Sequence, residues 1–528
     1  MLPGEPPRPE SRSSLTGWAL AVFLLSALFV AWSLAARFCD NIDEGIYLDG
    51  GLRMAHGEMP YRDFFTYLGP GTFALLAILF KTLGTSLAVS RVPVVIDLAL
   101  MTALVFVLVA KLAGRRAAAV TAPCFLAFQT FNRDFVVANH RWDSNALSFA
   151  AVACCFLLLE KPSRYWAFGS GVCAGLAVWT TISSALLGVL LFGWLLWDQR
   201  LRACAKTYAA GAGMVFVTGV TWLALHQALF PMIDGMIWSV HNYAGPNRAP
   251  YGLVVGGYGH IFRNSGALET LLIAVFATCI TLPATLPVLN IAGWPLRLFY
   301  RPERRIAFLL ACGAAMAASS WPRPDMTHLM YVAAPHYVLA SVLLARTLAP
   351  GARSAIAGLF LLVAASETGF AVYCRLTDPS LATRVGVVHG KQADLAVLRT
   401  IESRVSANQT LFVFPYWPVY YFTTGARNPT RYSYLQPGMF PKHDEEEVLR
   451  TLSDHPPEMV VYRRVQPASY LTIWPSADPA RLRMTAIENF LSDRYTLVSR
   501  EGKFEVLQLR ERSRDPAPSQ APETVTSP

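Results

Sequence analysis

The sequence predicts a polytopic α-helical membrane protein with a small α/β domain near its carboxy-terminal end. Its 528 residues are 54% hydrophobic and only 15% charged, and the mean hydropathy is +0.37. Apolar runs of membrane-spanning length recur through the first two thirds of the chain. After residue 373 the pattern changes to short segments typical of a water-soluble domain. These observations exclude an ordinary soluble protein, in which about a quarter of the residues are charged.

The apolar runs predict about 11 membrane spans, because a helix needs about 20 residues to cross the hydrocarbon. The longer runs are 16–38, 88–110, 207–230, 267–291 and 354–373. The shorter runs are 117–131, 144–159, 165–181, 182–197, 306–321 and 328–345. The first run follows a weakly basic segment and is longer than the apolar part of a secretory signal, so we expect an uncleaved span.

The distribution of Lys and Arg predicts the orientation in the membrane. Basic residues gather in alternate connections between the spans, and by the positive-inside rule those connections are cytoplasmic. The amino terminus is then inside, and the part after residue 373 is outside. The basic set is Arg8, Arg12, Lys111, Arg115, Arg116, Lys161, Arg164, Arg200, Arg202, Lys206, Arg297, Arg301, Arg304, Arg305, Arg346 and Arg353.

This orientation requires that the segment 69–84, 'GPGTFALLAILFKTLG', does not cross the membrane. The segment is short, it opens with Gly and Pro, and it contains Lys81. We therefore expect an interfacial helix that lies on the outer face. The first external loop then extends from residue 39 to residue 91.

The domain organisation follows from these boundaries. We expect a cytoplasmic amino terminus at 1–15, a transmembrane domain at 16–373, an external α/β domain at 374–510 and a disordered Pro/Ser-rich tail at 511–528. In the external domain, strand patterns occur at 410–415, 458–464, 495–499 and 504–510. Helix patterns occur at 391–405, 444–453 and 479–491.

The first external loop is acidic although the chain carries a net charge of +10. The stretch 'CDNIDEGIYLDGGLRMAHGEMPYRDFF' holds six carboxylates against two arginines, and Asp43 and Glu44 come directly after the first span. Partial desolvation raises the pKa of a carboxyl group and makes it a better general base. The alternative is a solvated loop whose charge helps keep this segment outside, and composition alone does not decide between the two.

The loop also resembles a known family. 'DEGIYLDGGLRMAHGEMPYRDFFTYLGPGTFALLAILFKTLGTSLAVSRVP' is similar to the first external loop of the GT-C glycosyltransferases. The nearest branch is glycosyltransferase family 39-like, with the protein O-mannosyltransferases and the lipid A aminoarabinose transferase. The resemblance implies a GT-C-like fold and inverting transfer of a sugar from a polyprenyl-phosphate donor at the extracytoplasmic face. It also implies that Asp43 is the catalytic base, with Glu44 beside it.

The second external loop, 'NRDFVVANHRWDSNAL' (132–147), resembles the family less closely. The family often has Arg-Pro-Asp before the fourth span, whereas this chain has 'HRWD'. Asp143 fits the catalytic position by its distance to that span. His140 and Arg141 are candidates for the lipid phosphate, because the guanidinium fork matches phosphate oxygens. In the alternative, Arg141 only pairs with Asp143 or extends to the membrane interface.

A third motif, 'WPRPDMTHLMYVAAP' (321–335), resembles a family loop near the lipid phosphate. It adds Arg323, Asp325 and His328 to the donor-binding candidates, together with Arg62 of the first loop. Cationic groups at this place would stabilise the charge of a departing phosphate. The alternative for His328 is a structural role.

Two further segments carry weaker signals. The long loop 231–266 is typical of a mobile cover and contains His241, Arg248 and Arg263. The aromatic stretch 416–438 would either stack on sugar or, as we expect, form the core of the external domain.

The sequence contains no P-loop, GxGxxG, HExxH, GxSxG or zinc-type motif, so a nucleotide-sugar donor is unsupported. We expect no cofactor and no metal, although a divalent ion between Asp43 or Glu44 and a phosphate is conceivable. The expected partners are a polyprenyl-phosphate-linked sugar, membrane lipids and an acceptor that is a protein, a lipid or an envelope glycan. Nucleic acid is not expected, and the expected location is a bacterial inner membrane.

Two other functions stay open at this point. A transporter or flippase of lipid-linked glycans would need ionisable residues deep within the spans, where Asp97 and Glu367 are the acidic residues present. A non-catalytic assembly protein could keep the Asp-Glu pair without the activity. The sequence also leaves open whether Cys39 and Cys374 form a disulfide.

Overall fold

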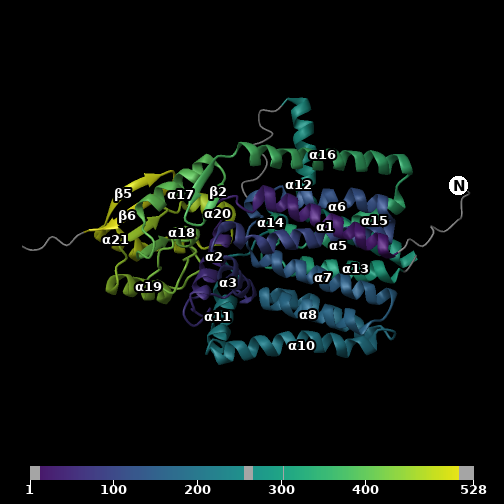
Figure 1. Ribbon diagram of the computed structural model, residues 1–528, viewed down its shortest axis with the longest axis horizontal. Helices are drawn as coiled ribbons and strands as arrows, with labels where there is room; N and C mark the ends of the chain where they lie inside the picture. Colours follow the sequence, from purple (N-terminus) through teal and green to yellow (C-terminus); the bar gives the residue numbers. More distant parts are fainter. Residues whose placement is uncertain (1–11, 255–265, 301–302, 511–528) are drawn as a thin grey trace, which may run out of the picture.

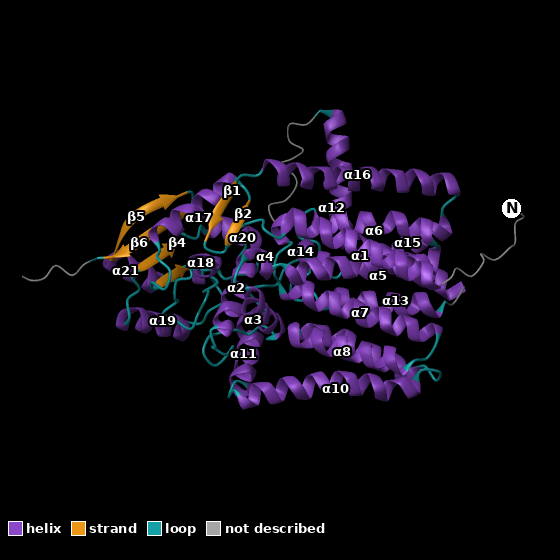
Figure 2. Ribbon diagram, in the orientation of Figure 1, coloured by secondary structure: helices purple, strands orange, loops and turns teal. Residues whose placement is uncertain are grey.

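The computed structural model describes residues 12–254, 266–300 and 303–510. Long helices run roughly parallel in a bundle, and a smaller part that contains the strands lies at one end of it (Figures 1 and 2). The predicted class, a helical membrane protein with a small α/β part, is confirmed.

Each predicted apolar run overlaps a helix of the bundle, and the run 328–345 begins in a separate short helix, α14 Met326–Tyr331, before α15. The helices are α1 Arg12–Leu34, α5 Val92–Ala113, α6 Arg115–Thr130, α7 His140–Glu160, α8 Arg164–Thr180, α9 Ala185–Trp197, α10 Arg202–Leu225, α12 Ala267–Tyr300, α13 Arg304–Ala318, α15 Ala334–Thr347 and α16 Pro350–Thr377.

Within the described residues, six stretches are long and apolar enough to cross a membrane. The other bundle helices are shorter, so the number of about 11 spans stays a prediction. The six stretches are Ser14–Leu34, Leu87–Ala113, His140–Glu160, Arg202–Leu225, Ile273–Pro295 and Pro350–Thr377.

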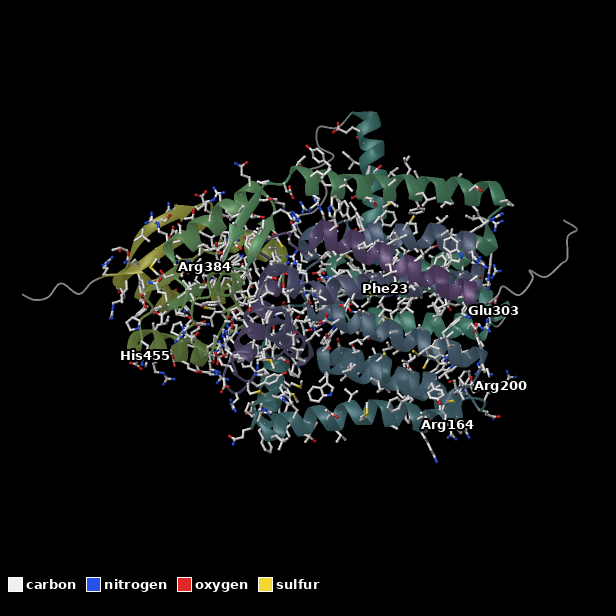
Figure 3. All side chains as sticks on the ribbon, viewed as in Figure 1. Phe23, Arg164, Arg200, Glu303, Arg384 and His455 are labelled. Carbon is white, nitrogen blue, oxygen red and sulfur yellow. The ribbon has the colours of Figure 1, made fainter. Side chains whose placement is uncertain are left out.

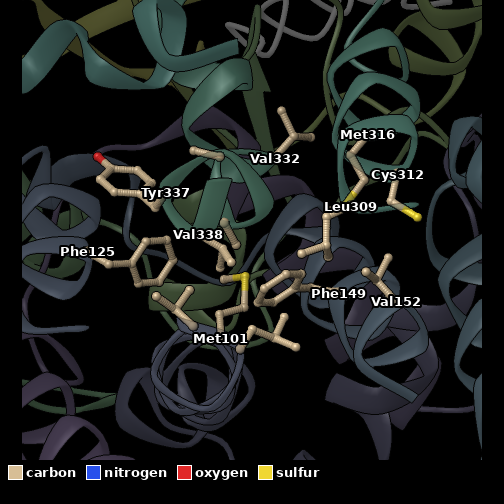
Figure 4. Close-up of a cluster of buried hydrophobic side chains, with 14 of the residues drawn as sticks. Met101, Phe125, Phe149, Val152, Leu309, Cys312, Met316, Val332, Tyr337 and Val338 are labelled. Carbon is tan, nitrogen blue, oxygen red and sulfur yellow. The ribbon is translucent and has the colours of Figure 1, made fainter. Parts of the chain in front are cut away.

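The bundle is held together by an apolar core. Helix α5 packs against α1, α6 and α7, while α8 packs between α7 and α10. Figure 4 shows part of this core, where Met101, Phe125, Phe149, Leu309 and Val338 are buried together. Large apolar side chains are also exposed on the outer helices, as expected for surfaces that face lipid. Examples are Leu25, Leu28, Phe216, Val217 and Leu362.

The two ends of the bundle differ in their charged residues. Figure 3 shows Arg164, Arg200 and Glu303 at the end that lies away from the strands. Ion pairs tie the connections together at that end, including Arg346 with Glu303 at 2.5 Å and Lys111 with Glu160 at 2.8 Å. The opposite end meets the strand-containing part.

Short helices lie between the bundle and the strands (Figure 1). They include α2 Ile42–Ala55, α3 Gly71–Leu83, α4 Leu87–Ser90, α11 Leu229–Asn242 and α14 Met326–Tyr331. The predicted interfacial segment 69–84 is α3, which lies at this junction and not among the parallel helices. Helix α11 occupies the start of the loop 231–266. Arg263 of that loop lies outside the described residues.

The strand-containing part has two sheets. Strands β1 Ser380–Thr383 and β2 Gly386–His389 form an antiparallel hairpin. The second sheet has the order β3-β4-β6-β5, in which β3 and β4 are parallel and the other neighbours antiparallel. Its strands are β3 Leu411–Phe414, β4 Met459–Tyr462, β5 Tyr495–Glu501 and β6 Phe504–Leu509. The helices of this part are α17 Gln392–Arg404, α18 Val419–Thr424, α19 Lys442–Asp454, α20 Pro467–Ile473 and α21 Thr485–Arg494.

The first external loop and the strand-containing part share one hydrophobic core. Tyr47 and Phe73 of the loop are buried in the same cluster as Phe412 and Val413 of β3. Helix α2 approaches α18 so closely that a Cβ atom at Gly45 would lie 2.3 Å from the backbone nitrogen of Val419. The boundary predicted at 373/374 therefore divides the sequence but does not divide this core.

All nine cysteines are free thiols. The Cys374 sulfur accepts a hydrogen bond from Nη2 of Arg133 at 3.0 Å, and Cys39 is buried beside Arg91. The two residues do not form the disulfide that the sequence left open.

Candidate active site

A cavity of about 690 Å³ lies at the junction of the bundle, the short helices and the strand-containing part. Its size is within the range of sites for small molecules, roughly 300–1,000 Å³. It brings together six of the side chains that the sequence singled out: Asp43, His140, Arg141, Arg323, Asp325 and His328.

Asp43 lies in the first turn of α2. Asn41 caps this helix by accepting a hydrogen bond from the backbone N–H of Glu44 at 3.0 Å. The cap fixes the first turn, from which Asp43 reaches the cavity. Asn139 donates to Oδ2 of Asp43 at 3.4 Å. Asp43 is exposed to the cavity, which it lines.

Two opposing effects set the basicity of Asp43. Burial raises the pKa of its carboxyl group, and the positive charges of His328, Arg323 and Arg141 act in the opposite direction. The net result is a pKa above the usual value of 3.8. Asp43 therefore combines the properties of a general base with a position beside several cations.

Glu44 does not line the cavity, and its place in the catalytic group stays a prediction. Its two carboxylate oxygens accept hydrogen bonds from Nε and Nη2 of Arg91, each at 2.7 Å. Oε1 also accepts from the backbone N–H of Ala138 at 3.2 Å. Both side chains of the ion pair are buried, so Glu44 links α2 to the beginnings of α5 and α7.

Asp143 does not line the cavity either, and its assignment to the catalytic group stays a prediction. Its Oδ2 atom accepts a hydrogen bond from the hydroxyl of Thr72 on α3, and its carboxyl group lies near that of Asp97 on α5. The side chain of Asp143 thus lies where three helices meet.

His140 and Arg141 open helix α7 at the wall of the cavity. Nδ1 of His140 lies 2.7 Å from the hydroxyl of Thr181, and its ring stacks on Tyr47 with the centroids 5.3 Å apart. Arg141 does not pair with Asp143. Its guanidinium instead lies near the hydroxyl of Tyr243, and both residues line the cavity.

The motif 321–335 supplies a preorganised cation. Nε of Arg323 donates to Oδ2 of Asp325 at 2.6 Å, and Nη2 donates to the carbonyl of Ile473 at 2.6 Å. Nη1 has no hydrogen-bond partner among the described residues, although the side chain is 6% exposed. A fixed guanidinium with one unused nitrogen at a cavity wall is well suited to bind an oxyanion.

Asp325 orients both basic groups of this motif. It caps α14 by accepting the N–H of His328 at 3.0 Å, and its Oδ1 lies 2.7 Å from Nδ1 of the same histidine. Burial alone would raise the pKa of Asp325, but His328 and Arg323 outweigh that effect and lower it to about 2. Asp325 is therefore an anion over the whole neutral range.

Arg62 lies on the surface and does not line the cavity. It forms two hydrogen bonds with Asp63, at 2.8 and 2.7 Å, and donates to the carbonyl of His226 at 3.0 Å. Its predicted contact with a lipid phosphate has no support from this position.

The sequence did not single out three basic residues that the strand-containing part adds to the cavity. Arg463 and Arg464 follow β4, and Lys503 lies in the turn between β5 and β6. For Arg463 and Arg464, the one feature in the sequence that could have indicated a binding role is 'YRR' at the end of a predicted strand. The same pattern is also common on solvated surfaces. Further lining residues are Asp40, Tyr67, Tyr243, Tyr331, Tyr416, Trp417, Gln436, Gln466, Tyr470 and Trp474.

In the described ranges, no group of three or more His, Cys, Asp or Glu side chains could hold a metal ion. The titratable groups that line the cavity include both acids and bases.

Residues 68–224 match the family model described as dolichyl-phosphate-mannose-protein mannosyltransferase. This match covers α3 to α10, including the start of α7 at the cavity. No curated protein matches the chain by sequence.

Solved structures extend the likeness to nearly the whole chain. ArnT from Cupriavidus metallidurans bound to undecaprenyl phosphate has a TM-score of 0.53 and 15% identity, over 93% of this chain and 98% of that one. The apo state of the same protein has a TM-score of 0.54, and the match covers 94% of this chain and 98% of that one. The apo oligosaccharyltransferase of Archaeoglobus fulgidus has a TM-score of 0.53 and 13% identity, and the match covers 88% of this chain and 72% of that one.

The chain has the GT-C fold. The predicted resemblance to this superfamily is thereby confirmed. Within the GT-C fold of this chain, the cavity is lined by a carboxyl group from α2, by basic side chains from α7 and around the start of α14, and by residues of the strand-containing part.

Proposed function

We propose that this protein is an inverting glycosyltransferase that moves a sugar from a polyprenyl-phosphate-linked donor to an acceptor. One observation carries the proposal: Asp43 shares a cavity with Arg141, Arg323 and His328, whose charges act on it most strongly. A base and a set of cations are the two requirements of a displacement at a glycosyl phosphate. The family-model match and the likeness to ArnT bound to undecaprenyl phosphate support the same reaction.

The reaction is a single displacement. The acceptor hydroxyl or amine transfers its proton to Asp43, and its oxygen or nitrogen forms a bond to the anomeric carbon. The bond from that carbon to the phosphate oxygen breaks, and its electron pair leaves with the polyprenyl phosphate. Attack opposite to the leaving group inverts the configuration.

The cations act on the leaving group. The negative charge that develops on the phosphate oxygen is stabilised by preorganised donors at the cavity wall. Arg323 is suited to this role because Asp325 and the carbonyl of Ile473 fix its plane and leave Nη1 unused. Arg141 and His328 provide donors from α7 and α14.

The hydrocarbon chain of the donor requires an apolar path. The membrane side of the cavity is lined by Phe128 and Phe131, around the end of α6, and by Ile280 and Pro283 of α12. Part of α12 is apolar and long enough to cross a membrane. A lipid phosphate among the cations would thus have its first isoprene units against apolar side chains.

The proposal includes the orientation predicted from the basic residues. The end of the bundle that carries Arg164 and Arg200 (Figure 3) would face the cytoplasm of a bacterial cell. The cavity, at the opposite end, would then face the exterior, where lipid-linked sugars serve as donors.

The test compares the wild-type protein with Asp43→Asn. Purified protein in lipid is incubated with a panel of polyprenyl-phosphate sugars and a membrane extract as acceptor source, and the lipids are analysed by mass spectrometry. We expect one donor to lose its sugar with wild-type protein, and at least about 100-fold more slowly with Asp43→Asn, the usual effect of losing a general base.

Glu58→Gln is the matched control, because Glu58 is an acid of the same loop that pairs with Arg53 outside the cavity. This variant should keep the wild-type rate. Transfer at the wild-type rate by Asp43→Asn would disprove the role of Asp43. A transporter of lipid-linked glycans would leave every donor intact.

A further inference from the structure

The strand-containing part brings three cations to the cavity that the proposed reaction does not use. Arg464 and Lys503 are exposed, line the cavity, and have no ion-pair partner among the described residues. Arg463 is half-buried, and its Nη1 lies 3.2 Å from Oδ2 of Asp40. The guanidinium of Arg464 lies over the ring of Tyr462, 5.5 Å from its centroid. Two cations that line one cavity without a carboxylate partner favour an anionic ligand, because a guanidinium and an ammonium both donate to oxyanions.

This set of cations is separate from the set around Asp43. The charges that act most strongly on Asp43 come from His328, Arg323 and Arg141. Arg464 instead follows β4, and Lys503 lies in the turn between β5 and β6. The cavity therefore has two basic regions, one at the bundle and one on the strand-containing part.

Aromatic rings surround the second region. The guanidinium of Arg463 lies over the ring of Trp417, 4.1 Å from its centroid, and Tyr416 stacks on Trp417 with centroids 4.1 Å apart. A second stacked pair, Tyr470 and Trp474, has centroids 4.4 Å apart. All these side chains line the cavity. Aromatic surfaces beside cations suit a ligand with one apolar face and a charged group.

We infer that Arg464 and Lys503 form a second oxyanion-binding subsite, which holds a phosphate or carboxylate group of the acceptor. That the ligand is the acceptor rests on the proposed function: the donor phosphate occupies the cations near the apolar wall, and the nucleophile enters from the other side of Asp43. Asp40 joins the two regions, since it pairs with Arg463 and lies three residues before Asp43.

The experiment measures binding without turnover. The full chain in lipid nanodiscs is saturated with undecaprenyl phosphate and then titrated with glucosamine 1-phosphate, glucuronate or the neutral N-acetylglucosamine. We expect an anionic probe to bind at least about 10-fold more tightly than the neutral sugar, a difference of about 1.4 kcal/mol. The better of the two anionic probes identifies the oxyanion as phosphate or carboxylate.

The double variant Arg464→Gln, Lys503→Gln should weaken the binding of the anionic probe at least about 10-fold and leave that of undecaprenyl phosphate unchanged. Arg500→Gln is the control, since Arg500 pairs with Glu505 in the same hairpin and lies outside the cavity lining. Equal binding of the neutral sugar, no effect of the double variant, or displacement of the probe by undecaprenyl phosphate would each overturn the subsite. A failure of the proposed function is distinguishable, because no donor would then lose its sugar although the anionic probe binds.

Discussion

Asp49 is a carboxyl group buried between α2 and the strand-containing part. It is 4% exposed and accepts a hydrogen bond from the hydroxyl of Ser433. Burial raises the pKa of Asp49 from 3.8 to about 6, although Arg53 acts in the opposite direction. At neutral pH the folded protein must therefore keep a buried charge that burial disfavours.

The pKa of Asp49 predicts a change of stability with pH. Between pH 3.8 and about 6 the folded state holds a proton that the unfolded state releases, so the free energy of unfolding falls as the pH rises through this window. Above that window the loss is complete and amounts to roughly 3 kcal/mol. We expect Asp49→Asn to raise the unfolding temperature at pH 7.5 and to match the wild type near pH 3.5.

Thermal unfolding in lipid nanodiscs at both pH values measures this difference, with Glu446→Gln as a control, since Glu446 is an exposed acid of α19. A lower unfolding temperature for Asp49→Asn at pH 7.5 would mean that the charged form is the one that the fold stabilises.

The contrast between Asp43 and Glu44 shows how far the sequence predicts the site. The motif identifies the segment, but consecutive side chains of a helix point about 100° apart. Asp43 therefore enters the cavity, whereas Glu44 points to Arg91. The direction of each side chain depends on which helices pack around α2. The same limit applies to Asp143, which is directed towards Thr72 and Asp97.

At the level of elements, the contact between α2 and α18 depends on Gly45. In most helix interiors a change from Gly to Ala stabilises by about 0.5–1 kcal/mol. At Gly45 the added Cβ would meet the backbone nitrogen of Val419 at 2.3 Å, so one helix would have to move. Gly169 of α8 has no atom within 4 Å of the same position.

We therefore expect opposite effects from two equivalent substitutions. Gly45→Ala should lower the unfolding temperature and the yield of folded protein, while Gly169→Ala should leave both unchanged or slightly raised. Size-exclusion profiles and thermal unfolding of the two variants measure this. An equal response to both substitutions would show that α2 and α18 can separate without cost.

The elements themselves were partly predictable. Strands β3 to β6 and helices α17, α19 and α21 coincide with predicted segments, because each shows a strand or helix pattern flanked by turn residues. Helix α18 was not predicted, since all six of its residues are buried and its sequence has no amphipathic period. Strands β1 and β2 have four residues each, too few for a pattern.

At the level of the whole molecule, the acidic loop packs against the strand-containing part. Leu48 and Phe80 from the loop share a core with Val460 and Leu507 from the sheet. The composition of the sequence predicts two classes of segment, apolar and water-soluble, but the contacts between remote segments are not visible in it. The predicted membrane class is thus confirmed, whereas the shared core was missed.

We expect the fragment 374–510 not to fold on its own, because it would expose the apolar surface that the first loop covers. Expression of this fragment, followed by thermal unfolding and NMR, is the measurement. A cooperative transition with well-dispersed amide signals would show instead that the core of the sheet is sufficient without the loop.

The apolar wall made by α6 and α12 determines which measure of concentration applies to a lipid substrate. A molecule with a long hydrocarbon tail stays in the bilayer, and it would meet the cavity by lateral diffusion in two dimensions. The quantity that sets its rate of encounter is then the mole fraction in the membrane, not the amount per litre. An excess of inert phospholipid would dilute the substrate in the membrane and lower the rate of its reaction, although no side chain of the cavity has changed.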